Sequence, residues 1–293
     1  MSSQGEWVER AARVFTPNYR PAPVVLERGD GVFVYDRAGR RYLDLVAGIA
    51  VSALGHNHPR LVDAIARQAS RLMHTSNLYL NRPSIELAER LVELSFGDRV
   101  FFCNSGAEAN EACIKLARRY AHHRGEPARH RILSFHQSFH GRTFAALAAT
   151  GQPKYHEGFG PMPSGFVHLP FGDASALEAE LDDTVAAVLV EPIQGEGGVH
   201  PAPPGFLTRV RRLCDAAGAL MIVDEVQSGV GRTGRMWGYE LEDVRPDVIA
   251  VAKGVGGGTP LGALVATEPV AQALHPRTHG STYGRSPRPF AAR

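Results

Sequence analysis

Two short apolar runs, each followed closely by a charged residue, constrain the fold of this chain most strongly. Leu220–Val223 leads directly into Asp224, and Val248–Val251 leads, after one alanine, into Lys253. Uninterrupted runs rich in Val and Ile are typical of parallel strands that helices cover on both faces. In such sheets ligands bind beyond the carboxyl ends of the strands. We therefore expect Asp224 and Lys253 to belong to one ligand site.

This pair of side chains indicates a particular chemistry. Pyridoxal 5'-phosphate (PLP) needs a lysine amine for its Schiff base and a carboxylate that keeps its ring nitrogen protonated. A lysine and an acid at the ends of buried strands supply both groups. The sequence therefore predicts a PLP site as the leading functional hypothesis.

Composition excludes several other classes of protein. The chain has 293 residues, is 44% hydrophobic and carries a formal net charge of +2, so it can bury a large core and gives nucleic-acid binding no support. Its first residues are polar, and no apolar stretch resembles a signal peptide or a membrane span. Cys103, Cys113 and Cys214 are widely spaced, which is typical of reduced core residues. We expect a soluble, cytoplasmic protein.

The order of the patterns predicts an α/β protein with a doubly wound, mostly parallel sheet between helices. A short helix and a β-meander over residues 32–45 precede two amphipathic helices, the second of which begins near Pro83. Residues 151–172 are rich in Gly and Pro and indicate a long surface connection. The expected strands of the sheet are Val100–Phe102, Ile132–Phe135, Ala186–Val190, Leu220–Val223 and Val248–Val251.

A first candidate site follows the strand that ends at Phe102. Ser105, Gly106 and Ala107 stand before a helix, where free backbone N–H groups and the helix dipole can bind an anion. An ordinary helix N-cap explains the same residues equally well.

A second candidate site lies in residues 138–143. Phe139 could stack on a planar ring while Arg142 binds a carboxylate in a bidentate way, and the alternative is a core phenylalanine and a surface arginine. His136 and His140 have the spacing of two metal ligands on a helix. Because no acidic third ligand accompanies them, we expect no metal site.

Two glycine-rich loops complete the candidates. Glu191 and Glu196 lie in the loop after the strand that ends at Val190, and either carboxylate could order a pocket or simply be solvated. Gly229–Gly234 matches the dinucleotide pattern G-x-G-x-x-G, which requires a helix to begin at the third glycine. The residues that follow are poor helix formers, so NAD binding is the weaker alternative.

These segments together resemble one family, the class III or ornithine-type aminotransferases of PLP fold type I. The resemblance runs from about Asn18 to Gly284. Within the family, residues 229–232 and 253–258 resemble the acetylornithine branch more than the 4-aminobutyrate or ornithine branches. The motifs that carry the resemblance are Asn104–Ala109, Phe139–Thr143, Glu191–Glu196, Asp224–Gln227, Gly229–Gly234, Ala252–Gly254 and His279–Gly284.

The resemblance implies a role for each matching residue. Lys253 would carry PLP and then move the proton between substrate and cofactor, while Asp224 would pair with the ring nitrogen. A homodimer is also implied, because the family's active sites lie at the subunit interface. The other implied cofactor contacts are Ser105, Gly106 and Ala107 at the phosphate, Phe139 and Val226 on the two ring faces, Gln227 at the ring hydroxyl, and Thr282 at the phosphate of the other subunit.

The resemblance also implies the substrates. Arg142 would bind the substrate α-carboxylate, Ser281 would belong to the substrate site, and Glu196 would neutralise a C-terminal arginine between half-reactions. The implied reaction is a ping-pong transfer of the terminal amino group of N-acetylornithine to 2-oxoglutarate, which yields glutamate, in arginine biosynthesis. The alternatives are a succinylornithine, ornithine or 4-aminobutyrate aminotransferase, and a non-catalytic PLP-fold remnant.

The end of the sequence departs from the family pattern. Relatives continue after Gly284 into a long helix and a small C-terminal domain, whereas residues 285–293 contain three arginines and two prolines, which do not favour that helix. We therefore expect an N-terminal segment (1–50) that belongs to the small domain in relatives, a PLP-binding large domain (51–284) and an aberrant tail (285–293). The small C-terminal domain and the arginine partner of Glu196 would be missing.

Overall fold

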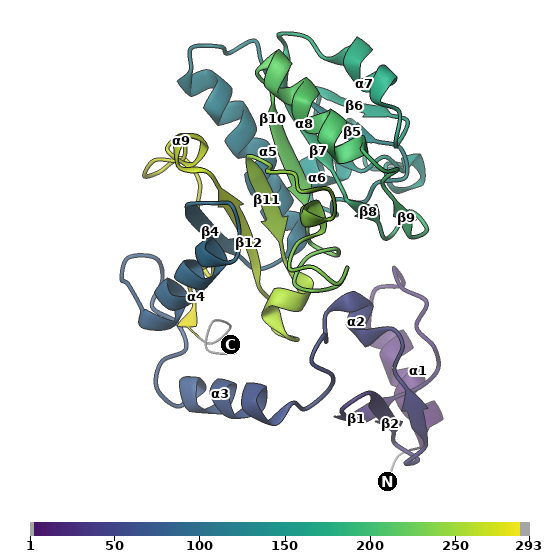
Figure 1. Cartoon of the computed structure of the whole chain (residues 1–293). Helices are drawn as coiled ribbons and strands as arrows, with labels where there is room; N and C mark the ends of the chain where they lie inside the picture. The colour runs from purple at the N-terminus through teal and green to yellow at the C-terminus, as the bar shows by residue number, and fades with distance from the viewer. Residues whose placement is uncertain (1–2, 288–293) are drawn as a thin grey trace.

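A computed structural model describes residues 3–287 and places most of them around one seven-stranded sheet (Figure 1). Helix α1 (Gln4–Val14) and a small antiparallel sheet form an N-terminal region that lies apart from the large sheet (Figure 1). Of the tail expected at residues 285–293, residues 288–293 lie outside the described part. No helix within residues 3–287 is long and apolar enough to cross a membrane.

The small N-terminal sheet confirms the predicted β-meander and adds one strand to it. The buried carboxylate of Asp36 accepts hydrogen bonds from the amides of Ala38 and Arg40 and from the Tyr42 hydroxyl, which fixes the turn between the last two strands. The strands, in spatial order, are β1 (Leu26–Asp30), β2 (Phe33–Asp36) and β3 (Arg41–Leu43).

Three helical segments lead from this region to the large sheet. The first, α2 (Ala47–Ala50), is a short turn with positive φ angles rather than a regular helix. The other two confirm the predicted amphipathic helices, α3 (Pro59–Ala69) and α4 (Arg82–Glu93). Asn81 caps α4 by accepting from the Ser84 amide, and Pro83 lies in its first turn, where a missing N–H costs nothing.

The large sheet is mostly parallel, as predicted. Its order is β4-β12-β11-β10-β7-β5-β6, and only β12 runs antiparallel to its neighbours. All five expected strands are present. The bounds are β4 (Arg99–Cys103), β5 (Arg131–Phe135), β6 (Phe166–Leu169), β7 (Val185–Val190), β10 (Leu220–Asp224), β11 (Val248–Val251) and β12 (Gly262–Ala266).

Helices cover both faces of this sheet, which explains why its central strands are apolar without alternation. In β10, Met221 and Val223 belong to the apolar cluster on one face, and Leu220 and Ile222 belong to the cluster on the other. Helix α8 (Phe206–Ala217) packs into the first cluster and α5 (Gly106–His123) into the second. The shorter elements are α6 (Phe144–Ala149), η1 (Pro153–Tyr155), α7 (Ala174–Glu180), β8 (Ile193–Gln194), β9 (His200–Pro201), η2 (Gly238–Glu242), η3 (Lys253–Gly256) and α9 (Glu268–Ala271).

The long surface connection expected over residues 151–172 also contains regular structure that the sequence did not predict. The segment contains η1 and the edge strand β6, which pairs in parallel with β5. Because β6 is only four residues long and lies between Gly165 and Pro170, the surrounding turn residues obscured its pattern. The long segment is therefore fastened to the sheet close to the loop that carries Phe139 and Arg142.

Candidate active site

The carboxyl ends of β10 and β11 bring Asp224 and Lys253 to one cavity of about 430 Å³, as predicted. This volume is typical of a small-molecule site. Most of the site residues expected from the sequence line it: Ser105, Gly106, Ala107, Phe139, Arg142, Glu196, Asp224, Val226, Gln227 and Lys253.

Asp224 is held by three donors. Its Oδ2 atom lies 2.7 Å from His140 Nδ1 and 2.8 Å from Asn110 Nδ2, and its Oδ1 atom accepts from the Val226 amide at 3.0 Å. Facing a carboxylate, His140 Nδ1 carries a proton. The fixed carboxylate is only 4% exposed. It can therefore present a negative charge to a ligand without reorienting.

His140 and Asn110 are the residues of this site that the sequence did not single out for this role. His140 was considered only as a metal ligand with His136, and it faces Asp224 instead. Within residues 3–287, no group of three His, Cys, Asp or Glu side chains is placed to hold a metal ion. Asn110 lies one turn inside α5, and only the three-dimensional approach of α5 to β10 brings it to Asp224.

Lys253 begins η3 with a φ of +49°, in the left-handed region. Burial lowers the pKa of its amine, although the charge of Asp224 opposes this effect. Among the described residues, no carboxylate lies within ion-pairing distance of Lys253 Nζ. An amine with a lowered pKa and no fixed partner is suited to nucleophilic chemistry.

The N-cap alternative at Ser105 is confirmed. Its hydroxyl accepts from the Glu108 amide at 3.2 Å, and helix α5 begins at the next residue. Gly106 and Ala107 contribute the first amides of the helix and line the cavity. A Cβ atom on Gly106 would lie 2.6 Å from Val226 Cγ1, so only glycine lets the helix start this close to the cavity wall. The cap and an anion site are thus compatible.

The two loop carboxylates differ in environment. Glu191 is 6% exposed and accepts from the Phe139 amide at 3.0 Å, so of the two alternatives the solvated side chain is excluded for it. Burial, reinforced by the charge of Asp224, raises the pKa of Glu191 well above its usual value. Glu196 is exposed and accepts from Gln227 Nε2 at 3.1 Å.

The glycine-rich loop at Gly229–Gly234 lacks the geometry of a dinucleotide site. A series of turns occupies it, and the next regular element is the 3-10 helix η2. Trp237, which precedes η2, is fully buried. No α-helix begins at the third glycine, so the structure contradicts the requirement for the NAD alternative.

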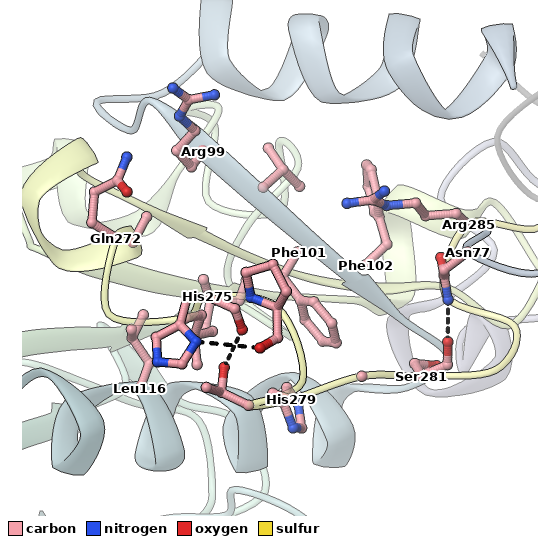
Figure 2. Close-up of a pocket in the computed structure, with 17 residues that line it drawn as sticks. Asn77, Arg99, Phe101, Phe102, Leu116, Gln272, His275, His279, Ser281 and Arg285 are labelled. Atoms are coloured by element: carbon pink, nitrogen blue, oxygen red, sulfur yellow. Dashed lines mark hydrogen bonds between the residues drawn. The ribbon is translucent and has the colours of Figure 1, made fainter. Parts of the chain in front are cut away.

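Ser281 and Thr282 are the predicted site residues that do not line this cavity. Ser281 lines a separate cavity of about 500 Å³ beside β4. Figure 2 shows this cavity, and Phe101, Leu116 and His275 also line it. Its hydroxyl accepts from Asn104 Nδ2 at 3.2 Å, and Asn104 belongs to the cavity of Lys253. Thr282 is exposed.

The arrangement combines a poised lysine, a fixed buried carboxylate, a helix N-terminus and an arginine around one cavity. The sequence pattern of the class-III aminotransferases matches residues 14–292. The chain belongs to this family. As a member, it is a PLP-dependent aminotransferase.

Individual aminotransferases resemble the chain over nearly its whole length. It is 53% identical over 290 residues to the acetylornithine aminotransferase of Xanthomonas axonopodis pv. citri, covering 98% of this chain and 71% of that protein. It is 51% identical to the protein of the same name from Myxococcus xanthus, covering 99% of this chain and 73% of that protein.

Solved structures of aminotransferases share the fold. The ornithine aminotransferase of Toxoplasma gondii superimposes with a TM-score of 0.96 at 36% identity, covering all of this chain and 70% of that one. The N-acetylornithine aminotransferase of Stenotrophomonas maltophilia gives a TM-score of 0.81 at 44% identity, covering 97% of this chain and 69% of that one. These comparisons confirm the predicted PLP fold type I architecture.

The cavity fits PLP by the chemistry of its donors. Lys253 supplies an amine, Asp224 a fixed carboxylate for the ring nitrogen, and the first amides of α5 an anion-binding helix end. Phe139 and Val226 supply apolar surface for a planar ring. The same cavity therefore contains groups suited to bind the ring, to bind the phosphate and to form the covalent link of PLP.

Proposed function

We propose that this aminotransferase moves the terminal amino group of N-acetylornithine to 2-oxoglutarate and so produces glutamate, as a step of arginine biosynthesis in the cytoplasm. The single observation that carries the proposal is the shared cavity of Lys253, Asp224 and Arg142. The choice of donor is supported by relatives named acetylornithine aminotransferase at 50–53% identity.

Lys253 is the catalytic residue in this proposal. When bound, PLP supplies an electron sink for the carbon that loses a proton. Lys253 would hold the cofactor through its amine and, as a free amine, would take that proton and return it at the neighbouring position. Because burial lowers the pKa of the amine, a larger fraction of Lys253 is unprotonated, and able to act as a base, than of an exposed lysine at the same pH.

Asp224 keeps the ring nitrogen protonated. Its carboxylate is already oriented by His140 and Asn110, so little reorganisation is needed when a ligand enters. Gly106 and Ala107, together with Ser105, would hold the phosphate at the start of α5. Phe139 and Val226 would contact the ring, and Gln227 would bind the ring hydroxyl.

Arg142 binds the substrate α-carboxylate. The guanidinium has no hydrogen-bonded or ion-paired partner within residues 3–287, and it lines the cavity. A planar group with free donors matches a carboxylate in a bidentate way. Glu196, which is exposed and lines the same cavity, would separate the two half-reactions by pairing with a positive group when no second carboxylate is bound.

A homodimer completes the site in our proposal. Thr282 is exposed and lies outside the cavity of its own chain, so it is free to reach the phosphate of a second copy, and Ser281 stands beside it. Leu78, Tyr79 and Leu80 expose 68–86% of their surface, which supports burial of this segment against another surface. We also propose the division into an N-terminal segment (1–50) and a PLP-binding domain (51–284).

A second candidate donor is ornithine itself. The high TM-score with the Toxoplasma gondii ornithine aminotransferase favours it, although the sequence identity is lower than with the acetylornithine enzymes. The two donors differ in an acyl group beside the α-carboxylate. Comparing the rates of amino transfer from the two donors distinguishes the two candidate functions.

The test is amino transfer by the purified full chain with PLP and 2-oxoglutarate. We expect glutamate to form faster from N-acetylornithine than from ornithine, N-succinylornithine or 4-aminobutyrate. The Lys253→Ala variant should form no glutamate from any of these donors. Faster glutamate formation from ornithine would show that ornithine, and not N-acetylornithine, is the donor. No glutamate and no change in the absorption spectrum of the PLP-loaded chain with any of these donors would favour the non-catalytic remnant.

A further inference from the structure

We infer that Tyr155 is a positioning residue that holds Arg142 ready for the substrate carboxylate and thereby sets the affinity for carboxylate-bearing substrates. The inference deepens the proposed function, because it assumes that Arg142 is the carboxylate-binding group. The guanidinium of Arg142 has aromatic neighbours but no anionic one in the described part of the chain.

Two rings surround the guanidinium. The central carbon of Arg142 lies 3.9 Å from the ring centroid of Tyr155 and 5.5 Å from that of Phe139. The two rings themselves meet edge to face, with centroids 5.9 Å apart and planes at 81°. A cation over an aromatic face is attracted by the ring quadrupole, and arginine stacks there without using its N–H donors. The donors of Arg142 therefore stay available for a ligand.

Tyr155 acts through Arg142 and not by direct contact with a ligand. It does not line the cavity that holds Lys253, Asp224 and Arg142. Its hydroxyl makes no hydrogen bond within residues 3–287, so the ring alone accounts for the contact. We therefore expect phenylalanine at position 155 to preserve the contact with Arg142 and an aliphatic residue to lose it.

The segment that carries Tyr155 is bonded on its N-terminal side to the start of the loop that carries Arg142 and on its C-terminal side to the end of helix α6. On the N-terminal side, Gln152 Nε2 donates to the carbonyl of Ser138 at 3.1 Å, and the Gln137 amide donates to the carbonyl of Gly151 at 2.8 Å. The ring of Tyr155 is thus tied to the start of the 138–143 loop.

On the C-terminal side, His156 makes the second attachment. Its Nε2 atom lies 2.9 Å from the carbonyl oxygens of both Leu147 and Thr150, at the end of α6, the helix that begins just after Arg142. Because both ends of the Tyr155 segment are bonded to elements that flank Arg142, the ring has a defined place relative to the guanidinium. A surface arginine would otherwise sample many rotamers, and fixing them beforehand lowers the entropy lost on binding.

The first experiment measures binding of glutarate, an unreactive dicarboxylate, to the PLP-loaded full chain by calorimetry. We expect Tyr155→Leu to raise the Kd about three- to tenfold and Tyr155→Phe to leave it within about twofold. Arg142→Gln should weaken binding at least as much as Tyr155→Leu. In the double variant the Tyr155 change should add almost nothing, because its effect passes through Arg142.

The second experiment uses two amino donors that differ only in the carboxylate. N-Acetylornithine carries it, and N-acetyl-1,4-diaminobutane lacks it. We expect Tyr155→Leu to raise KM for N-acetylornithine with kcat little changed, and to leave the kinetics of the diamine unaltered. A general folding defect would impair both donors alike.

Several results would overturn the inference. These are unchanged glutarate binding in Tyr155→Leu, equal losses in the leucine and phenylalanine variants, additive effects in the double variant, and no glutarate binding by the unsubstituted chain. If glutarate binds as described but N-acetylornithine is not a donor, the proposed substrate is wrong and the role of Tyr155 stands.

Discussion

His140 Nδ1 lies 2.7 Å from Asp224 Oδ2, and the exposed fractions of the two residues are only 2% and 4%. Asn110 reaches the same carboxylate oxygen, so two buried donors from different elements converge on one acceptor. Neither donor can turn to water if that acceptor is removed. The arrangement therefore couples the stability of the fold to the residue proposed to act on the cofactor ring.

Removing the carboxylate tests this coupling. We expect Asp224→Ala to lower the free energy of unfolding by about 1–3 kcal/mol for each donor left unpaired, to retain some PLP and to lose most amino transfer. Urea unfolding and the half-reaction with N-acetylornithine measure the two effects. His140→Ala, which removes one donor and keeps the carboxylate, is the control and should retain more activity. Near-normal half-reaction rates in Asp224→Ala would contradict the role of this residue.

The fold was predictable where burial leaves a recognisable hydrophobic pattern in the sequence. The central strands are apolar on both faces, so their runs were evident, and the residues at their ends, Asp224 and Lys253, followed from the parallel arrangement. Strand β12 was not expected because its small residues, Gly262 and Ala263, lack the β-branched pattern. The short edge strand β6 was obscured by neighbouring Gly and Pro.

The candidate site was predictable where single residues carry the chemistry, and not where contacts between distant segments do. Asn110 and His140 meet Asp224 across 114 and 84 residues of sequence, and no spacing rule encodes such a contact. Tyr155 escaped notice for the same reason, since it lies in a segment interpreted as surface. Its significance arises from a ring placed over Arg142.

We expect the free energy of unfolding to depend on pH because of Glu225. Burial raises the pKa of its carboxyl from a usual value of 4.5 to about 7. Between these values the folded protein keeps a proton that the unfolded chain releases, so the contribution of Glu225 is present below about pH 4.5 and is lost as the pH rises through 7. The loss should be on the order of 3 kcal/mol. Denaturant unfolding between pH 5 and pH 8 measures it.

The matched variant for that measurement is Glu225→Gln. Glutamine keeps an acceptor near the amides of Gly238 and Tyr239 but does not titrate. Its unfolding free energy should fall less between pH 5 and pH 8 than that of the unsubstituted chain. Parallel profiles in the two proteins would show that Glu225 does not carry the effect.

The three cysteines should resist thiol reagents in the folded protein. Burial raises the pKa of Cys103 and of Cys214 to about 12 and that of Cys113 well above its usual value. Thiolates, which are the reactive form, are therefore scarce at neutral pH. A colorimetric thiol assay should detect little reaction under native conditions and all three cysteines in denaturant. Rapid native labelling of any of them would disagree with this burial.

The stability of the fold should depend less on the charge of Glu191 than on the hydrogen bond that its side-chain oxygen accepts. Burial raises the pKa of Glu191, and its Oε2 atom accepts from the Phe139 amide. We expect Glu191→Gln to change the free energy of unfolding by less than about 1 kcal/mol, whereas Glu191→Leu leaves that amide unpaired and costs about 1–3 kcal/mol. Thermal or urea unfolding compares the two, and equal losses would argue against the hydrogen bond.

The central claim is that Lys253 carries the cofactor, and chemical trapping tests it most directly. The full chain is loaded with PLP, reduced with borohydride, digested and mapped by mass spectrometry. We predict the phosphopyridoxyl label on Lys253, with Lys253→Ala unlabelled and Lys115→Ala labelled as strongly as the unsubstituted chain. A label on Lys115 or Lys154 in place of Lys253 would contradict the account.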